Sequence, residues 1–210
     1  MAHIDALFLD FDGVLVESVD LKAAAFQALY ADQPQEVQDR IMAYHAAQDG
    51  ISRVVKISHC HKHILGQSLS QALLDSLAAD YCQKVEDAVV KAPWVPGAKE
   101  FLQTHHPSHK LFVVSGTPEE EIKRIAESRG MMAWLTEVRG SPAAKADIVR
   151  ALMAKYDLRA EHCLFIGDAM ADWQAAEETG MDFLGRVAPG HPSPFPNSTQ
   201  TVADLCGLRF

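Results

Sequence analysis

Two aspartates follow the first apolar run of the chain and are the residues best placed to do chemistry. The segment Leu7–Ser18 reads LFLDFDGVLVES, so an apolar run ends on Asp10 and Asp12 and then turns at Gly13. Side chains alternate along a strand, so two carboxylates that are two residues apart should point the same way. One could attack phosphorus while the other transfers protons. The alternative interpretation is an ordinary turn, in which Asp–Gly is frequent.

Residues of complementary chemistry follow two later apolar runs of the sequence. They are Ser115, Gly116 and Thr117 after the first of these runs, and Asp168 and Asp172 after the second. Lys145 lies in the first turn of a helix predicted to start near Pro142. Crowded carboxylates repel each other unless a cation lies between them, and oxygen ligands suit Mg²⁺. A hydroxyl, a lysine and the N–H groups of a helix N-terminus are suited to phosphate oxygens.

Short apolar runs bounded by turn residues predict the strands that must position these groups. They are Ile4–Leu9, Lys110–Gly116, His162–Asp168 and Asp182–Val187, with a weaker candidate at Leu135–Val138. Helical patterns separate the later strands, which predicts an α/β fold with a Rossmann-like parallel sheet. Ligands bind outside the carboxyl ends of the strands in such a sheet, and the polar residues above follow those ends.

Capping patterns predict where the helices between these strands begin. The first has Thr117 as N-cap, Pro118 in the first helical position and Glu120 three residues after the cap, a capping box. The helix that contains Lys145 has the same Ser/Thr–Pro opening, with Ser141 before its proline. We therefore expect one helix to start at Pro118 and the other to start near Pro142.

The segment from about residue 19 to residue 90 has helical patterns and no clear strand. It separates the first strand from its sheet partners by far more than the 10–12 or so residues that a crossover needs. The simplest topology is an all-helical domain inserted after the first strand. We expect residues 1–16 and 93–210 to form the α/β core and residues 17–92 to form a helical cap.

The composition limits the function classes that remain. The net charge of −9 argues against binding to nucleic acids, and no apolar stretch approaches the length of a membrane span. The N-terminus does not resemble a signal peptide, and four scattered cysteines fit reduced thiols, so we expect a cytoplasmic protein. A compact monomer is the default expectation for a chain of 210 residues.

Four segments together resemble the motifs of the haloacid dehalogenase-like hydrolase superfamily, in the subgroup with a helical cap after the first strand. DFDGVL resembles the first motif, SGT after an apolar strand resembles the second, Lys145 matches the third, and GDAMAD resembles the fourth. This subgroup includes phosphoglycolate phosphatases and β-phosphoglucomutase-like enzymes. A single motif of this kind is weak evidence of membership, but four motifs in the right order and strand context are strong evidence of a resemblance.

The resemblance implies a Mg²⁺-dependent phosphatase, a phosphoric monoester hydrolase that acts on a small phosphorylated metabolite. Asp10 would form an aspartyl-phosphate, and Asp12 would protonate the leaving group and then activate water. Asp10, the backbone carbonyl of Asp12 and Asp168 would bind Mg²⁺, and Asp172 would support the metal shell. True dehalogenases and phosphonate hydrolases lack the second aspartate of this motif. Its presence here as Asp12 favours phosphate esters as substrates.

The resemblance also implies how the phosphate and the rest of the substrate are held. Ser115 and Lys145 would hold phosphoryl oxygens, while Gly116 and Thr117 would contribute backbone and helix-cap contacts. The cap segment that ends at Arg53 resembles a mutase loop in which an arginine binds a second anionic group. Arg53 is therefore a candidate substrate contact, although a surface charge is an equal alternative.

Two other functions remain open from the sequence. The first is a β-phosphoglucomutase-like phosphotransferase, but those enzymes carry a histidine in the first cap helix where this chain has Lys22. The second is a non-enzymatic signalling domain that carries a phospho-aspartate. Known domains of that kind lack a helical insert of this size, so the resemblance to them is poor. The sequence does not identify the substrate.

Overall fold

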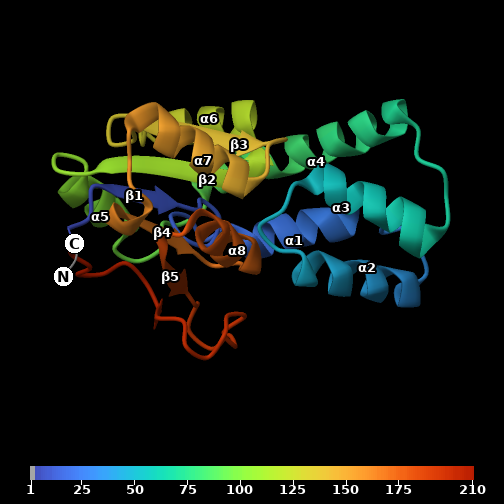
Figure 1. Ribbon diagram of the computed structural model, residues 1–210. Helices are drawn as coiled ribbons and strands as arrows, with labels where there is room; N and C mark the ends of the chain where they lie inside the picture. The colour runs from blue at the N-terminus through green and yellow to red at the C-terminus, as the bar shows by residue number, and fades with distance from the viewer. Residues whose placement is uncertain (1–2) are drawn as a thin grey trace.

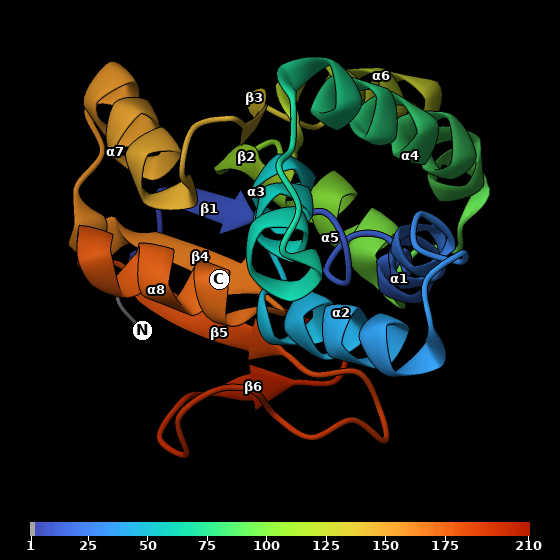
Figure 2. The same cartoon turned by 90° about the vertical axis from the view of Figure 1, so that its right-hand side faces the viewer.

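The computed structural model describes residues 3–210. Figures 1 and 2 show a sheet with helices on both faces and a group of helices beyond one end of it. The strands are all parallel in the order β3-β2-β1-β4-β5-β6. Their bounds are β1 Ala6–Leu9, β2 Lys110–Pro118, β3 Glu137–Ser141, β4 Cys163–Gly167, β5 Asp182–Arg186 and β6 Thr201–Val202. The predicted fold class and the first five strands are confirmed.

The central strand β1 is covered on both faces, which explains its continuous apolar sequence. Leu7 and Leu9 belong to one core, which includes buried side chains of α5 (Ala98–His105) and α6 (Glu119–Ser128). The alternate residues of β1 pack into a second core with α7 (Lys145–Tyr156) and α8 (Met170–Thr179). Because both faces are dry, polar side chains are excluded from the strand itself and begin where the strand ends.

The segment between β1 and β2 is helical, as the sequence predicts. Its elements are α1 Val19–Ala28, α2 Gln35–Ala47, α3 Arg53–His59, a π-helical turn at Cys60–Leu65, and α4 Gln71–Lys91. The two segments that connect this helical region to the sheet lie side by side. The N–H of Glu17 donates to the carbonyl of Pro93, and the N–H of Val95 donates to the carbonyl of Leu15. The division into a core and a cap at residues 17–92 stays a prediction.

The predicted helix starts after β2 and β3 are wrong. Thr117 and Pro118 are still part of β2, whose last residue pairs with Ser141, and α6 begins at Glu119. The ψ of Pro118 is 138°, an extended conformation that keeps it in the strand. Similarly, α7 begins at Lys145, so the Ser/Thr–Pro pattern marks strand ends here and not helix caps.

The chain ends with a connector and a short edge strand. Residues 188–200 contain no helix or strand, and the sequence analysis missed β6, the two-residue strand that follows. Within residues 3–210, no helix is both long and apolar enough to cross a bilayer.

Candidate active site

Asp10 lies immediately after β1, at the carboxyl edge of the sheet. Its backbone N–H donates to the carbonyl of Ile166 on β4 at 3.0 Å, which holds it between two strand ends. One carboxylate oxygen accepts from the N–H of Phe11 at 2.7 Å, and the other lies 2.9 Å from the Lys145 ammonium. The side chain is 3% exposed. Asp10 is therefore fixed in orientation, with little water around it.

An acidic cluster forms where β1 and β4 end. One carboxylate oxygen each from Asp10, Asp168 and Asp172 lies within 4.8 Å of the others. Burial and the neighbouring carboxylates raise the pKa of Asp10 to about 8 and raise the pKa of Asp168 well above its usual value. Three hard oxygen donors that repel one another fit a divalent cation such as Mg²⁺, which would restore their charged forms.

Two glycines let the backbone approach this cluster closely. A Cβ on Gly13, whose φ is +71°, would lie 1.9 Å from an oxygen of Asp168. A Cβ on Gly167 would lie 2.2 Å from the Cβ of Asp172. Any larger residue at either position would displace a member of the cluster.

Lys145 is the first residue of α7 and lies between two members of the acidic cluster. Its ammonium is 2.5 Å from Asp172 and 2.9 Å from Asp10, and the residue is 6% exposed. Burial opposes its charge, but the two carboxylates raise the pKa of Lys145 above its usual value. The ammonium is therefore charged and can offset negative charge on Asp10 and on a phosphoryl group bound to it.

Asp12 is held by two partners from the start of the cap segment and one from β2. Its carboxylate accepts from Ser18 Oγ at 2.5 Å and from Lys22 Nζ at 2.5 Å, and Thr117 Oγ1 donates at 3.4 Å. Burial opposes the charged form, yet Lys22 and Ser18 hold the pKa of Asp12 below its usual value. Asp10 and Asp12 thus have opposite pKa shifts: ionised Asp12 is the form that can accept a proton, whereas Asp10 needs a cation beside it to ionise.

The end of β2 brings Ser115, Gly116 and Thr117 to the same edge. Ser115 Oγ accepts from the backbone N–H of Thr117 at 3.1 Å, and the Ser115 side chain is buried. Thr117 Oγ1 accepts from Lys22 at 2.7 Å, so its hydroxyl faces the other site residues instead of capping α6. A Cβ on Gly116 would lie 2.6 Å from the carbonyl oxygen of Gly50, a cap residue. The cap loop therefore lies directly on this strand end.

Arg53, the candidate substrate contact, already has a protein partner. Its Nη2 lies 2.6 Å from both carboxylate oxygens of Glu121 on α6, and its guanidinium lies 4.5 Å from the ring centre of Tyr81. Both members of the ion pair are buried, with 7% exposure for Arg53 and 4% for Glu121. The pair connects the cap to the core, a role that sequence analysis did not foresee.

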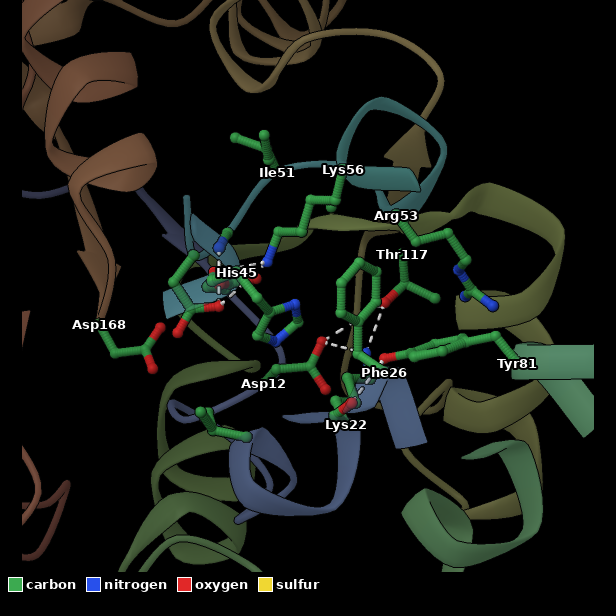
Figure 3. Close-up of a pocket in the computed structure, with 15 residues that line it drawn as sticks. Asp12, Lys22, Phe26, His45, Ile51, Arg53, Lys56, Tyr81, Thr117 and Asp168 are labelled. Atoms are coloured by element: carbon green, nitrogen blue, oxygen red, sulfur yellow. Dashed lines mark hydrogen bonds and ion pairs between the residues drawn. The ribbon is translucent and has the colours of Figure 1, made fainter. Parts of the chain in front are cut away.

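A cavity of about 60 Å³ lies between the cap and the strand ends (Figure 3). Of the predicted site residues it is lined by Asp10, Asp12, Arg53, Gly116, Thr117 and Asp168. The structure thus brings six of the nine together around one space. The other three do not line it, because Ser115 and Asp172 are buried and Lys145 lines a neighbouring groove. The loop Gly50–Ile51 separates this cavity from a groove of about 380 Å³ over α7 and α8.

Nine further residues of the cavity wall, all from the cap, were missed as site residues. Among them are Phe26, His45, Lys56 and Tyr81. Lys56 follows Arg53 by three residues on α3, so the two share a helix face. That spacing was the available signal for Lys56, whereas nothing local in the sequence indicates the other three.

A family model described as haloacid dehalogenase-like hydrolase matches residues 4–180. The chain belongs to this family. The match spans β1 to α8 and so includes every predicted site residue.

The curated relatives of this haloacid dehalogenase-like hydrolase include phosphatases. The phosphoglycolate phosphatase of Vibrio parahaemolyticus is 27% identical over 195 residues, which cover 87% of this chain and 83% of the relative. The 5'-nucleotidase of Pseudomonas aeruginosa is 33% identical over 110 residues, 48% of this chain and 49% of the relative. The chain is accordingly an enzyme of the phosphatase type within its family.

Solved structures of the family share the fold. CbbY from Rhodobacter sphaeroides in complex with phosphate has a TM-score of 0.75 at 14% identity and covers 97% of this chain and 96% of its own. A predicted phosphoglycolate phosphatase from Haemophilus somnus has a TM-score of 0.71 at 20% identity and covers 89% of this chain and 87% of its own. The helical segment after β1 is thus part of a shared architecture.

Proposed function

We propose that this chain is a Mg²⁺-dependent phosphatase that hydrolyses a small phosphorylated metabolite through an aspartyl-phosphate on Asp10. One observation carries the proposal. Asp12 and two members of the acidic cluster, Asp10 and Asp168, line the same small cavity. One water needs about 10–15 Å³ of such space, so about 60 Å³ holds a phosphoryl group and little more. A small substrate therefore fits better than a nucleotide.

In the first half of the proposed reaction, a carboxylate oxygen of Asp10 forms a bond to phosphorus and the ester oxygen departs. Asp12 donates its proton to that oxygen, which leaves as an alcohol. Bound Mg²⁺, held by Asp10, Asp168 and the backbone carbonyl of Asp12 with Asp172 in support, would supply positive charge beside the phosphoryl oxygens. Lys145 is already charged and fixed, so it stabilises developing negative charge without rearranging.

In the second half, water replaces Asp10 on phosphorus. The carboxylate of Asp12 accepts a proton from that water, whose oxygen bonds to phosphorus while the bond to Asp10 breaks. The products are inorganic phosphate and free Asp10, and Asp12 is again protonated for the next cycle. The Ser115 hydroxyl and the Gly116 and Thr117 backbone would hold the phosphoryl oxygens. Lys22 favours the charged form of Asp12 that this step requires.

The test is phosphate release by the wild-type protein, with and without Mg²⁺, across a panel of phosphorylated metabolites. Metal-dependent phosphate release, much faster from one metabolite than from the others, would support the proposal and identify the substrate. A bisphosphate product would support the mutase alternative, which Lys22 at the histidine position disfavours. A long-lived phosphoprotein without release would support the signalling alternative. The cytoplasmic location and monomeric state stay predictions.

A further inference from the structure

Three cationic side chains of the cap face the catalytic cavity, and two of them are already paired. Lys22 binds Asp12 and Thr117 at 2.5 and 2.7 Å. Arg53 binds both carboxylate oxygens of Glu121. Neither charge is available to a ligand unless an existing ion pair breaks.

Lys56 is the third of these cations and is poorly partnered. The residue is 4% exposed, and its ammonium points toward the cavity in Figure 3. Among the described residues, its one hydrogen bond goes to the carbonyl of His45 at a long 3.3 Å. The nearest carboxylate oxygen, on Asp49, is 3.9 Å away on a side chain that is 44% exposed. An ammonium has three donors, so two lack a close acceptor.

The surroundings of Lys56 make this arrangement costly in the empty protein. Phe26 and Tyr81 contribute aromatic walls to the cavity. Burial lowers the pKa of His45 to about 4, so this ring is neutral, and burial also lowers the pKa of Lys56. A buried charge without a full partner is unfavourable, and a protein can retain one where a ligand supplies the missing charge.

We propose that Lys56 binds a second anionic group of the substrate, a carboxylate that lies a few atoms from the phosphate ester. The proposal rests on the proposed phosphatase function and names its substrate class, the short phosphorylated carboxylic acids. It transfers to Lys56 the role that the sequence suggested for Arg53, whose charge is taken by Glu121. The small cavity of about 60 Å³ favours a carboxylate over a second phosphate, because a carboxylate takes less space.

Two substrates of similar size test the proposal on the wild-type enzyme. Phosphoglycolate and 2-hydroxyethyl phosphate share a two-carbon alcohol, and they differ in whether the far end is a carboxylate or a neutral hydroxyl. We expect kcat/KM to favour phosphoglycolate by about 10- to 100-fold, the usual contribution of a hydrogen bond to a charged group. A preference of less than about threefold would overturn the proposal without any variant having to fold.

Variants then assign the preference to Lys56. Lys56→Met should reduce the kcat/KM ratio of the two substrates to near one, and Lys56→Arg should restore part of it. Lys62→Met is the matched control, because Lys62 is exposed and lies six residues further along the cap. Equal losses of kcat/KM on both substrates would mean that Lys56 does not bind the carboxylate, although the phosphatase proposal would stand.

Stability and binding separate this role from a structural one. Lys56→Met should keep or raise the melting temperature, because it removes a poorly paired buried charge; a clear fall would indicate a structural lysine. Calorimetry should show weaker phosphoglycolate binding when Lys56→Met is added to Asp10→Asn. That measurement needs no turnover, so it tests Lys56 even if the wild type releases no phosphate. Unchanged binding would overturn the proposal.

Discussion

The ammonium of Lys22, on α1, lies 2.5 Å from the carboxylate of Asp12, on the loop that follows β1. Both side chains are largely buried, with 14% and 17% exposure. Ion pairs of this kind favour the charged form of the acid. Helix α1 therefore influences the protonation state of the proposed acid–base residue.

Replacing Lys22 should shift the pH dependence of turnover. Lys22→Met removes the cation that lowers the pKa of Asp12, so that pKa rises. Water activation requires ionised Asp12, so the acidic limb of the kcat–pH profile should move to higher pH. Lys62→Met should leave the limb in place. An unmoved limb in Lys22→Met would mean that Lys22 does not set the titration of the catalytic base.

The Arg53–Glu121 pair should stabilise the contact between cap and core. Arg53→Met leaves the Glu121 carboxylate buried without its partner, which should cost about 3–5 kcal/mol in the free energy of unfolding. Adding Glu121→Leu should recover most of this loss. The exposed Arg150 pairs with Asp147 and Glu178, and Arg150→Met should cost at most about 1 kcal/mol. Similar losses for Arg53→Met and Arg150→Met in urea denaturation would contradict this assignment.

The acidic cluster should make stability depend on pH and on metal. The pKa of Asp10 is 3.8 in its ordinary state and about 8 in the folded protein, so the folded state binds more protons between these values. Metal-free protein should therefore lose stability as pH rises from about 4 to about 8. Mg²⁺ at 100 times its Kd should add about 2.7 kcal/mol, roughly 5–11 °C in melting temperature.

Protons compete with the metal for the same carboxylates, which provides a control. The Mg²⁺-induced rise in melting temperature should be larger at pH 8 than at pH 5, and Asp168→Asn should reduce it. A rise of equal size in the wild type and in Asp168→Asn would place the bound cation elsewhere on the protein.

Gly116→Ala should interfere with the contact between the cap loop and β2. The added Cβ would lie 2.6 Å from the backbone oxygen of Gly50, which cannot move without displacing its loop. A misplacement of about 1 Å can reduce turnover about 10²-fold, and we expect a loss of that order in kcat/KM. Gly66→Ala is the control for a loss of stability alone, since its Cβ would meet nothing within 4 Å but its φ of +65° is strained for alanine. Wild-type activity in Gly116→Ala would show that the reaction does not need this close contact.

The sequence predicts the strand ends well because their signals are local. An apolar run that stops on Asp10, or on Asp168, marks both a buried strand and the edge where polar groups can begin. The same reasoning placed Lys145 at the start of a helix. The sequence could therefore predict that these residues lie at one sheet edge, without knowledge of any distant contact.

The starts of the helices, and the contacts that the helical cap makes with the core, could not be predicted in this way. Thr117 precedes a proline, a pattern shared by helix starts and extended segments, and pairing with β3 decides between them here. Arg53 and Glu121 are 68 positions apart, so no local pattern reveals their ion pair. The poor pairing of Lys56 likewise depends on how the cap packs over the strands.

The most direct test of the central claim is a covalent phosphoenzyme on Asp10. In Asp12→Asn, p-nitrophenyl phosphate supplies a leaving group that needs no proton, while hydrolysis of the aspartyl-phosphate lacks its base. We predict a burst of one p-nitrophenolate per enzyme in the presence of Mg²⁺, followed by slow turnover, with phosphate on the peptide that contains Asp10. Adding Asp10→Asn should abolish the burst. A burst that survives this second change, or phosphate mapped to another residue, would contradict the account.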